Sequence, residues 1–200
     1  MKVIGLTGSI GMGKSVAANM LRRLGLPVFD SDRAVHDLLN PKGAVFETVA
    51  LTFPESWDKK KLVIDRKKLG EIVFGNAENR QKLESILHPL VWFEQKKFLS
   101  AAQKSGAKWA VLDIPLLFET GSERKCDLVI CVDAPFLIQR QRVLGRPNMT
   151  EEKFFNILEG QMPNLEKKRR ADITIDTGLG CAHTFRQLKT LVGQLQKGTA

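Results

Sequence analysis

Short apolar runs and longer amphipathic segments alternate along the chain. The apolar run at positions 3–6 meets glycines at once, which predicts a buried strand that delivers the chain into a turn. Hydrophobic residues recur at helical spacing from Lys14 to Leu24, and Gly25 closes the helix that they predict. A second apolar run follows at 26–29. The beginning of the chain therefore predicts one β-α-β unit.

The middle of the chain differs in pattern from the two ends. Residues 32–106 have mostly helical periodicity and no convincing strand, which predicts a helical insertion. Strand patterns lie at 109–112, 128–132 and 173–175, and helical patterns lie at 136–146 and 183–196. Strands separated by helices predict an α/β protein whose five-stranded, mostly parallel sheet carries helices on both faces. Ligands then bind beyond the carboxyl ends of the strands.

Composition limits the class of protein. Two hundred residues with 43% hydrophobic content predict one compact unit with a single main sheet. We expect a cytoplasmic protein, because no apolar run approaches the roughly 20 residues of a membrane span and no signal-peptide pattern begins the chain. Cys126, Cys131 and Cys181 lack C-x-x-C spacing and are interpreted as packing residues. A net charge of +9 favours anionic partners, whether nucleic acid, membrane surface or phosphorylated small molecule.

A glycine-rich stretch separates the first predicted strand from the first predicted helix. It matches G-x-x-x-x-G-K-[ST], a loop that binds phosphate through converging backbone N–H groups. Gly8, Gly11 and Gly13 allow the curled backbone, and the following helix adds the positive end of its dipole. Lys14 would reach the β and γ phosphates, and the Ser15 hydroxyl would coordinate Mg²⁺. The motif predicts ATP with magnesium as the donor; the alternative is an ordinary glycine turn.

Three aspartates follow predicted strands. Asp32 is the preferred base, because phosphoryl transfer to a hydroxyl needs a group that orients the nucleophile and accepts its proton. The alternative is that Asp30 and Asp32 only cap the next helix. Asp113 could hold a magnesium-bound water or could be a turn former, and the sequence leaves both open.

Basic residues gather in three places. Arg142 and Arg146 are four apart on the helix predicted at 136–146, so they would share a face and could clamp phosphates. A solvated basic face is the alternative. The runs at 59–61 and 167–170 are interpreted as solvated surface, because no nucleic-acid motif or aromatic platform accompanies them.

Several classes of protein are excluded by missing motifs. The histidines are scattered and lack H-E-x-x-H spacing, which argues against zinc, and His88-Pro89 is expected to shape a helix junction. Neither the D-x-x-G nor the N-K-x-D string of GTPases occurs in the chain. A chain of this length leaves little room for the accessory domains of a motor or helicase. A kinase for a small acceptor remains.

Four motifs together resemble those of the dephospho-coenzyme A kinase family along nearly the whole chain. Besides the phosphate loop they are Phe29-Asp30-Ser31-Asp32, Leu87-His88-Pro89 and Pro115-Leu116-Leu117-Phe118-Glu119. The order and spacing of further residues also match, namely Gln139, Arg142, Arg146, Gln161-Met162-Pro163, Lys167 and Ala171-Asp172.

The resemblance implies a three-layer P-loop kinase fold in which residues 1–200 form a single unit of three parts. The nucleotide-binding core would comprise about 1–31, 107–139 and 171–200, the coenzyme-binding helical part about 32–106, and the lid about 140–170. The polar, charged composition of 147–170 is typical of a mobile lid.

By the same resemblance, the reaction moves the γ-phosphate of ATP to the ribose 3'-hydroxyl of dephospho-coenzyme A, the last step of coenzyme A biosynthesis. Asp32 is then the base, while Lys14, Arg142 and Arg146 stabilise the transferring phosphate. The implied ATP-binding residues are Gly8, Gly11, Met12, Gly13, Lys14, Ser15 and Val16, and those that border the acceptor are Asp32, His88, Leu116 and Glu119. The resemblance also implies a monomer or a weak trimer that binds no nucleic acid and no membrane.

Some positions depart from the usual pattern of the family. Ser9 and Met12 occupy slots where glycine and a small residue are common, and Val16 replaces a frequent threonine. Ile157 stands in place of an arginine of the lid, and Thr177 in place of an asparagine near the adenine. None of these changes touches the lysine, serine or aspartate assigned to the chemistry, so the expected reaction is unchanged.

Two other functions remain open. A kinase for another nucleotide or nucleoside would share the loop and the lid but would lack the His88-Pro89 and 115–119 motifs. A regulatory protein would bind ATP without phosphorylating an acceptor.

Overall fold

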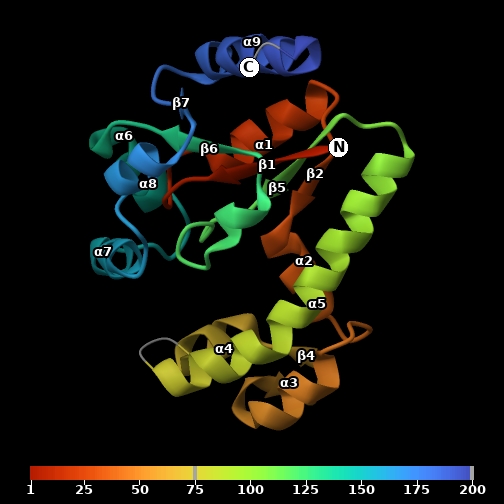
Figure 1. Cartoon of the computed structure of the whole chain (residues 1–200). Helices are drawn as coiled ribbons and strands as arrows, with labels where there is room; N and C mark the ends of the chain where they lie inside the picture. Colours follow the sequence, from red (N-terminus) through yellow and green to blue (C-terminus); the bar gives the residue numbers. More distant parts are fainter. Residues whose placement is uncertain (74–75, 199–200) are drawn as a thin grey trace. The chain divides into compact units, whose positions relative to one another are not determined.

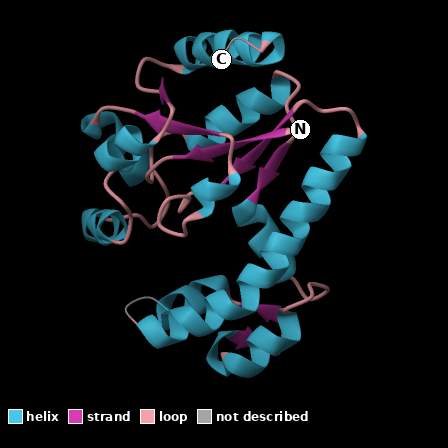
Figure 2. Cartoon of the chain, viewed as in Figure 1, coloured by secondary structure: helices cyan, strands magenta, loops and turns pink. Residues whose placement is uncertain are grey.

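The computed structural model describes residues 1–73 and 76–198, which form two compact units. The first unit combines Met1–Phe29 with Ala101–Ala200, and the second is Asp30–Ser100. Figure 1 colours both units along the chain, and Figure 2 distinguishes helices from strands.

A five-stranded parallel sheet organises the first unit, in the order β2-β5-β1-β6-β7. Its strands are β1 (Lys2–Thr7), β2 (Val28–Asp30), β5 (Trp109–Asp113), β6 (Leu128–Asp133) and β7 (Ile173–Asp176). In the centre, Leu6 of β1 is in register with Asp113 on one side and Ile130 on the other. The predicted α/β fold with a five-stranded sheet is confirmed. The loop after β1 lies where the strand order reverses, the position at which such sheets bind ligands.

Three helices of this unit begin close to where the hydrophobic periodicity predicts them, namely α1 (Lys14–Arg23), α6 (Phe136–Leu144) and α9 (Cys181–Lys197). The unit also contains α7 (Glu151–Glu159), α8 (Asn164–Arg170) and the 3₁₀ turn η2 (Ser122–Lys125), for which the sequence pattern predicts no helix. Within the described residues, none of the helices combines the length and apolar character that crossing a membrane requires.

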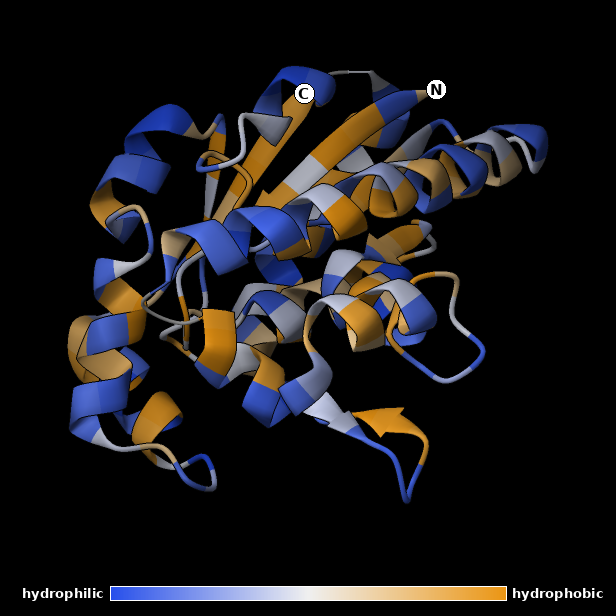
Figure 3. Ribbon diagram, turned by 90° about the horizontal axis from the view of Figure 1, so that it is seen from below, coloured by the Kyte–Doolittle hydropathy of each residue, from blue (hydrophilic) through white to orange (hydrophobic). Residues whose placement is uncertain are grey.

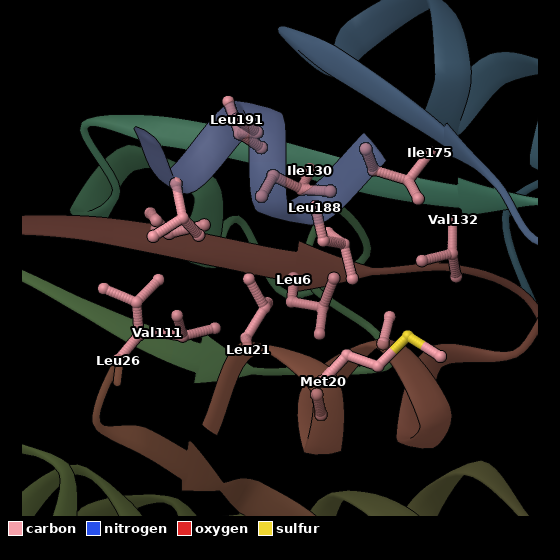
Figure 4. Close-up of a cluster of buried hydrophobic side chains, with 14 of the residues drawn as sticks. Leu6, Met20, Leu21, Leu26, Val111, Ile130, Val132, Ile175, Leu188 and Leu191 are labelled. Carbon is pink, nitrogen blue, oxygen red and sulfur yellow. The ribbon is translucent and has the colours of Figure 1, made fainter. Parts of the chain in front are cut away.

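One hydrophobic core joins α1 and α9 to the sheet. Leu21 of α1 and Leu188 of α9 are fully buried with Ile4, Leu6 and Ile130 of the strands (Figure 4). Hydrophobic residues run along the strands, while hydrophilic residues gather on the outer turns of the helices (Figure 3). Burial of this area fixes the strand ends, and therefore the loops that follow them, on a rigid support.

The second unit is mainly helical. Its elements are α2 (Ser31–Leu38), α3 (Phe46–Thr52), the 3₁₀ turn η1 (Pro54–Ser56), β3 (Trp57–Asp58), β4 (Val63–Ile64), α4 (Arg66–Val73) and the first part of α5 (Ala77–Lys104). Val45, Val49 and Phe53 are among its buried residues. The expectation of no strand in 32–106 is wrong in one detail, because β3 and β4 form a short antiparallel hairpin.

Two predicted helix boundaries also need correction. Pro89 lies inside the 28 residues of α5, so His88-Pro89 is not a junction between helices. Helix α6 ends at Leu144 with Gly145 as its C-cap, which leaves Arg146 outside the helix. A proline disfavours helical dihedrals at the residue before it, and Pro147 follows Arg146 directly.

The three cysteines have different environments. Cys131 is buried and Cys126 is half-buried, as expected for packing residues, whereas Cys181 is exposed. Burial raises the pKa of the Cys126 and Cys131 thiols to about 11. Both thiols therefore stay protonated at neutral pH and are poor nucleophiles.

Candidate active site

The phosphate loop joins β1 to α1 through a backbone that strongly favours glycine at two positions. Gly11 and Gly13 have φ angles of 77° and 86°, in the left-handed region. A Cβ atom at Gly11 would lie 2.6 Å from Cγ2 of Val143, and one at Gly13 would lie 2.9 Å from Oγ1 of Thr177. A Cβ atom at Gly8 would meet a side chain at 2.4 Å. Conformation and packing therefore both require glycine in this loop.

The amino end of α1 is open to an anion. Its N-cap residue, Gly13, has no side chain that could accept the first N–H groups of the helix, and no acidic residue stands in its first turn. The first N–H groups of a helix have no partner within the helix and carry its positive partial charge. This end of α1 therefore has the donors and the polarity that a phosphate needs.

Lys14 lies at this end of α1 and is held by Asp113 at the end of β5. Its Nζ is 2.6 Å from Asp113 Oδ1, and the two side chains are only 13% and 3% exposed. Asp113 therefore has an ionic partner in this structure, and a contact of its carboxylate with a magnesium-bound water stays a prediction. The carboxylate keeps the ammonium group ordered beside the loop, where phosphate oxygens can compete for it.

Ser15 and Val16 follow on the first turn of α1, and both are exposed. Within the described residues, the Ser15 hydroxyl has no hydrogen-bond partner. Mg²⁺ prefers oxygen ligands and is usually bound by one or two protein groups together with substrate phosphates. A hydroxyl on the exposed first turn after the phosphate loop fits such a metal.

Side chains from distant segments hold the first half of the loop. The Ser9 N–H donates to Asn164 Oδ1 at 3.1 Å, and the Ile10 N–H donates to Gln161 Oε1 at 3.0 Å. The Ile10 carbonyl accepts a bond from Gln139 Nε2 at 2.7 Å. Met12 anchors the second half, because it is buried and its sulfur accepts the Ala134 N–H at 3.2 Å. The loop is therefore preorganised by segments more than 100 residues away in sequence.

Arg142 of α6 is fixed against the same loop by Thr177. Its guanidinium group donates to the Thr177 hydroxyl at 3.0 Å, to the Thr177 carbonyl at 2.6 Å and to the Gly11 carbonyl at 3.4 Å. The Thr177 hydroxyl in turn lies 2.8 Å from the Met12 carbonyl. Arg146 is exposed beyond the end of α6, so the two arginines do not share a helix face as predicted.

Replacing Thr177 with valine tests this arrangement. The change keeps the volume but removes the hydroxyl that joins Arg142 to the loop, and a hydrogen bond to a charged group contributes about 1.5–3 kcal/mol. We expect kcat/KM for ATP to fall about tenfold in Thr177→Val, while Thr177→Ser stays near wild type. ATP titrations of both variants measure this. Equal kcat/KM values for the valine and serine variants would contradict the assignment.

The predicted acceptor loop, residues 115–119, follows β5. Leu116 is 39% exposed, so its side chain is accessible. Glu119 is engaged by the protein itself: its Oε1 lies 2.8 Å from Lys167 Nζ and accepts the Met162 N–H at 2.8 Å.

Asp32 and His88 belong to the second unit. Asp30 is the N-cap of α2, and its side chain accepts the Arg33 N–H at 3.0 Å. The alternative interpretation, in which an aspartate only caps this helix, therefore applies to Asp30. Asp32 stands in the first turn of the same helix and is exposed, which leaves it accessible to a substrate. His88 is exposed on α5 and stacks on Trp92 with ring centroids 6.4 Å apart.

Several site residues have no signal of their own in the sequence. Asn164 bridges the Ser9 N–H and the Asp133 carboxylate, to which it donates at 2.7 Å. Lys168 pairs with the same carboxylate at 2.5 Å, although its basic run is interpreted from sequence as solvated surface. These contacts join residues more than 30 positions apart and follow no local periodicity, so only the three-dimensional structure shows them.

This chain is similar to known proteins over nearly its whole length. A family model described as dephospho-CoA kinase matches residues 2–181. A dephospho-CoA kinase from Novosphingobium aromaticivorans is 47% identical over 195 residues, which cover 98% of this chain and 95% of the relative.

Two solved structures are also similar to this chain over nearly its whole length. A protein from Thermus thermophilus is 33% identical with a TM-score of 0.85, and the match covers 97% of each chain. A dephospho-CoA kinase from Campylobacter jejuni is 25% identical with a TM-score of 0.65, again over 97% of each chain.

Proposed function

Because the chain belongs to the dephospho-CoA kinase family, we propose that it transfers the γ-phosphate of ATP to the ribose 3'-hydroxyl of dephospho-coenzyme A. The products are ADP and coenzyme A, and the reaction is the last step of coenzyme A biosynthesis. The observation that carries the proposal is the family match over 2–181, which includes the phosphate loop as well as the whole second unit.

On the donor side, the residues of the phosphate loop act by position and charge. Backbone N–H groups from Gly11 to Val16 hold the phosphates of ATP, and Lys14 leaves Asp113 to bind the β and γ phosphates. Arg142 already lies beside the loop, where it neutralises charge that develops on the transferring group. Arg146, on the exposed segment after α6, joins it when ATP is bound.

Magnesium accompanies the nucleotide. The Ser15 hydroxyl would hold the ion, which would supply positive charge that offsets the charge of the phosphate oxygens.

On the acceptor side, Asp32 orients the 3'-hydroxyl and accepts its proton. His88, Leu116 and Glu119 border the acceptor. A carboxylate suits the task, because it can accept a proton as the oxygen–phosphorus bond forms and release that proton to water afterwards. No covalent intermediate on the protein is needed.

The three parts of the chain have separate tasks in this proposal. The core, about 1–31, 107–139 and 171–200, binds ATP; the helical part, about 32–106, binds the coenzyme; and the lid, about 140–170, excludes water during transfer. The protein acts in the cytoplasm as a monomer or a weak trimer, without nucleic acid or membrane.

Coupled measurement of ADP release tests the proposed acceptor. Dephospho-coenzyme A, nucleoside monophosphates and nucleosides are compared at equal concentration with ATP and Mg²⁺. We expect kcat/KM for dephospho-coenzyme A to exceed that for any other acceptor by at least about a hundredfold, because a site built for one acceptor leaves polar groups unpaired with another.

Two outcomes would overturn the proposal. Faster ADP release with a nucleoside monophosphate would identify a kinase for another nucleotide. ATP binding without release of ADP in the presence of any acceptor would indicate a regulatory protein.

A further inference from the structure

A fully buried lysine lies between two loops of the first unit. Lys167 of α8 has no exposed side-chain surface. Its Nζ lies 2.8 Å from Glu119 Oε1 and donates to the Pro115 carbonyl at 3.0 Å. The Thr7 hydroxyl donates to the same carbonyl, also at 3.0 Å, and Thr7 is the residue directly before the phosphate loop. The Pro115 carbonyl therefore accepts hydrogen bonds both from Lys167 and from the last residue of β1.

Glu119, the ionic partner of Lys167, is also linked to the phosphate loop, through Met162 and Gln161. Glu119 Oε1, the atom that faces Lys167, also accepts the Met162 N–H at 2.8 Å. The neighbouring residue, Gln161, accepts the Ile10 N–H of the phosphate loop at 3.0 Å. These contacts form a closed ring, which we call the Lys167 ring: Thr7, Ile10, Gln161, Met162, Glu119, Lys167 and Pro115.

Stability alone is a poor reason for a lysine at this position. An ammonium group loses its hydration when it is buried, and replacing a buried ion pair with apolar residues is often neutral or stabilising. The ion pair does supply fixed geometry, because its two partners also bind a backbone carbonyl and a backbone N–H. Those backbone groups belong to the loop 115–119 and to the segment that holds Ile10.

We infer that Lys167 is a positioning residue for phosphoryl transfer, which fixes the loop 115–119 and the phosphate loop in one arrangement. It acts through these loops and not on the reacting atoms. The inference rests on the proposed function, in which the loop 115–119 borders the acceptor and the phosphate loop holds the donor. Reacting atoms must approach to about 3–3.5 Å, and a displacement of about 1 Å can lower the rate on the order of a hundredfold.

Steady-state kinetics of Lys167→Met give the first test. We expect kcat to fall about 10- to 100-fold, since the loops lose their fixed separation. KM for ATP should change less than about threefold, because the N–H groups from Gly11 onward lie outside the ring. Arg169→Met is the matched control: it removes one positive charge from the same helix, and the Arg169 side chain is 70% exposed. Its kcat should equal that of wild type.

A double variant separates positioning from stability. Lys167→Met alone leaves the Glu119 carboxylate without its cation and should unfold at lower urea concentration than wild type. Combining it with Glu119→Gln removes both charges and should restore the midpoint. We expect kcat of the double variant to stay at least about tenfold below that of Glu119→Gln alone. Recovery of kcat together with the urea midpoint would overturn the inference.

Amide hydrogen exchange tests, without any acceptor, whether Lys167 fixes the loop 115–119 and the phosphate loop. In the double variant, exchange should rise together in peptides that cover 7–15 and 115–119, while Arg169→Met leaves both unchanged. Unchanged exchange in these peptides would overturn the inference whichever acceptor the wild type uses. If the wild type fails to phosphorylate dephospho-coenzyme A, only the proposed function fails. If both Lys167 variants fail to fold, Thr7→Val takes their place, because it removes one hydroxyl of the Lys167 ring. The same changes in kcat and in amide exchange are then expected of Thr7→Val.

Discussion

Replacing Asp32 with asparagine is expected to lower kcat by about two to four orders of magnitude, the usual contribution of a positioned general base. Asparagine has nearly the same shape but cannot accept the proton of the ribose hydroxyl. Binding of ATP should persist, because the phosphate loop belongs to the first unit and Asp32 to the second. Single-turnover transfer and equilibrium titration with ATP measure the two quantities separately.

Asp37→Asn provides the matched control for this change. Asp37 lies on the same helix, its side chain is 62% exposed and its partner is Arg33 at 3.9 Å. The substitution removes the same charge and should leave kcat near the wild-type value. If Asp32→Asn had the same kcat as Asp37→Asn, Asp32 would not be the base.

Replacing Lys14 with alanine should lower kcat on the order of a hundred- to a thousandfold, the range seen when one donor to a transition-state charge is removed. The ammonium group lies at the end of the phosphate loop, where it pairs with Asp113. Rapid-quench measurement of phosphoryl transfer gives the rate of the chemical step.

The same change also deprives the buried Asp113 carboxylate of its lysine partner, so a loss of folding must be separated from a loss of catalysis. Lys14→Met with Asp113→Asn removes both charges and should unfold at a urea concentration close to that of wild type. We expect this folded double variant to remain as slow as Lys14→Ala. Wild-type transfer by a variant without Lys14 would contradict its role.

Much of the fold follows from local pattern. Apolar runs of three to five residues predict the strands of the sheet because its central strands β1, β5 and β6 are mostly buried. The glycine motif predicts the phosphate loop because its spacing reflects required backbone angles. The hairpin of β3 and β4 could not be predicted, since strands of two residues are too short to show a period. The course of α5 through Pro89 is likewise a case in which the context overrides a local preference.

The candidate site is predictable only in part, for a related reason. Lys14 and the glycines belong to a contiguous motif, whereas the ion pair of Lys167 with Glu119 joins residues 48 positions apart. Whether a lysine in a basic run is solvated or buried depends on tertiary packing, which local sequence does not encode. The run 167–170 contains both kinds: Lys167 is buried and Arg169 is exposed.

Identification of the phosphorylated product shows directly whether this protein phosphorylates the ribose 3'-hydroxyl of dephospho-coenzyme A. After incubation of the wild-type protein with ATP, Mg²⁺ and dephospho-coenzyme A, ³¹P NMR and mass spectrometry locate the added phosphate. We expect ADP together with an acceptor that has gained one phosphate monoester at the ribose 3' position. An unchanged acceptor beside ADP and free phosphate, or a monoester at a different hydroxyl, would contradict it.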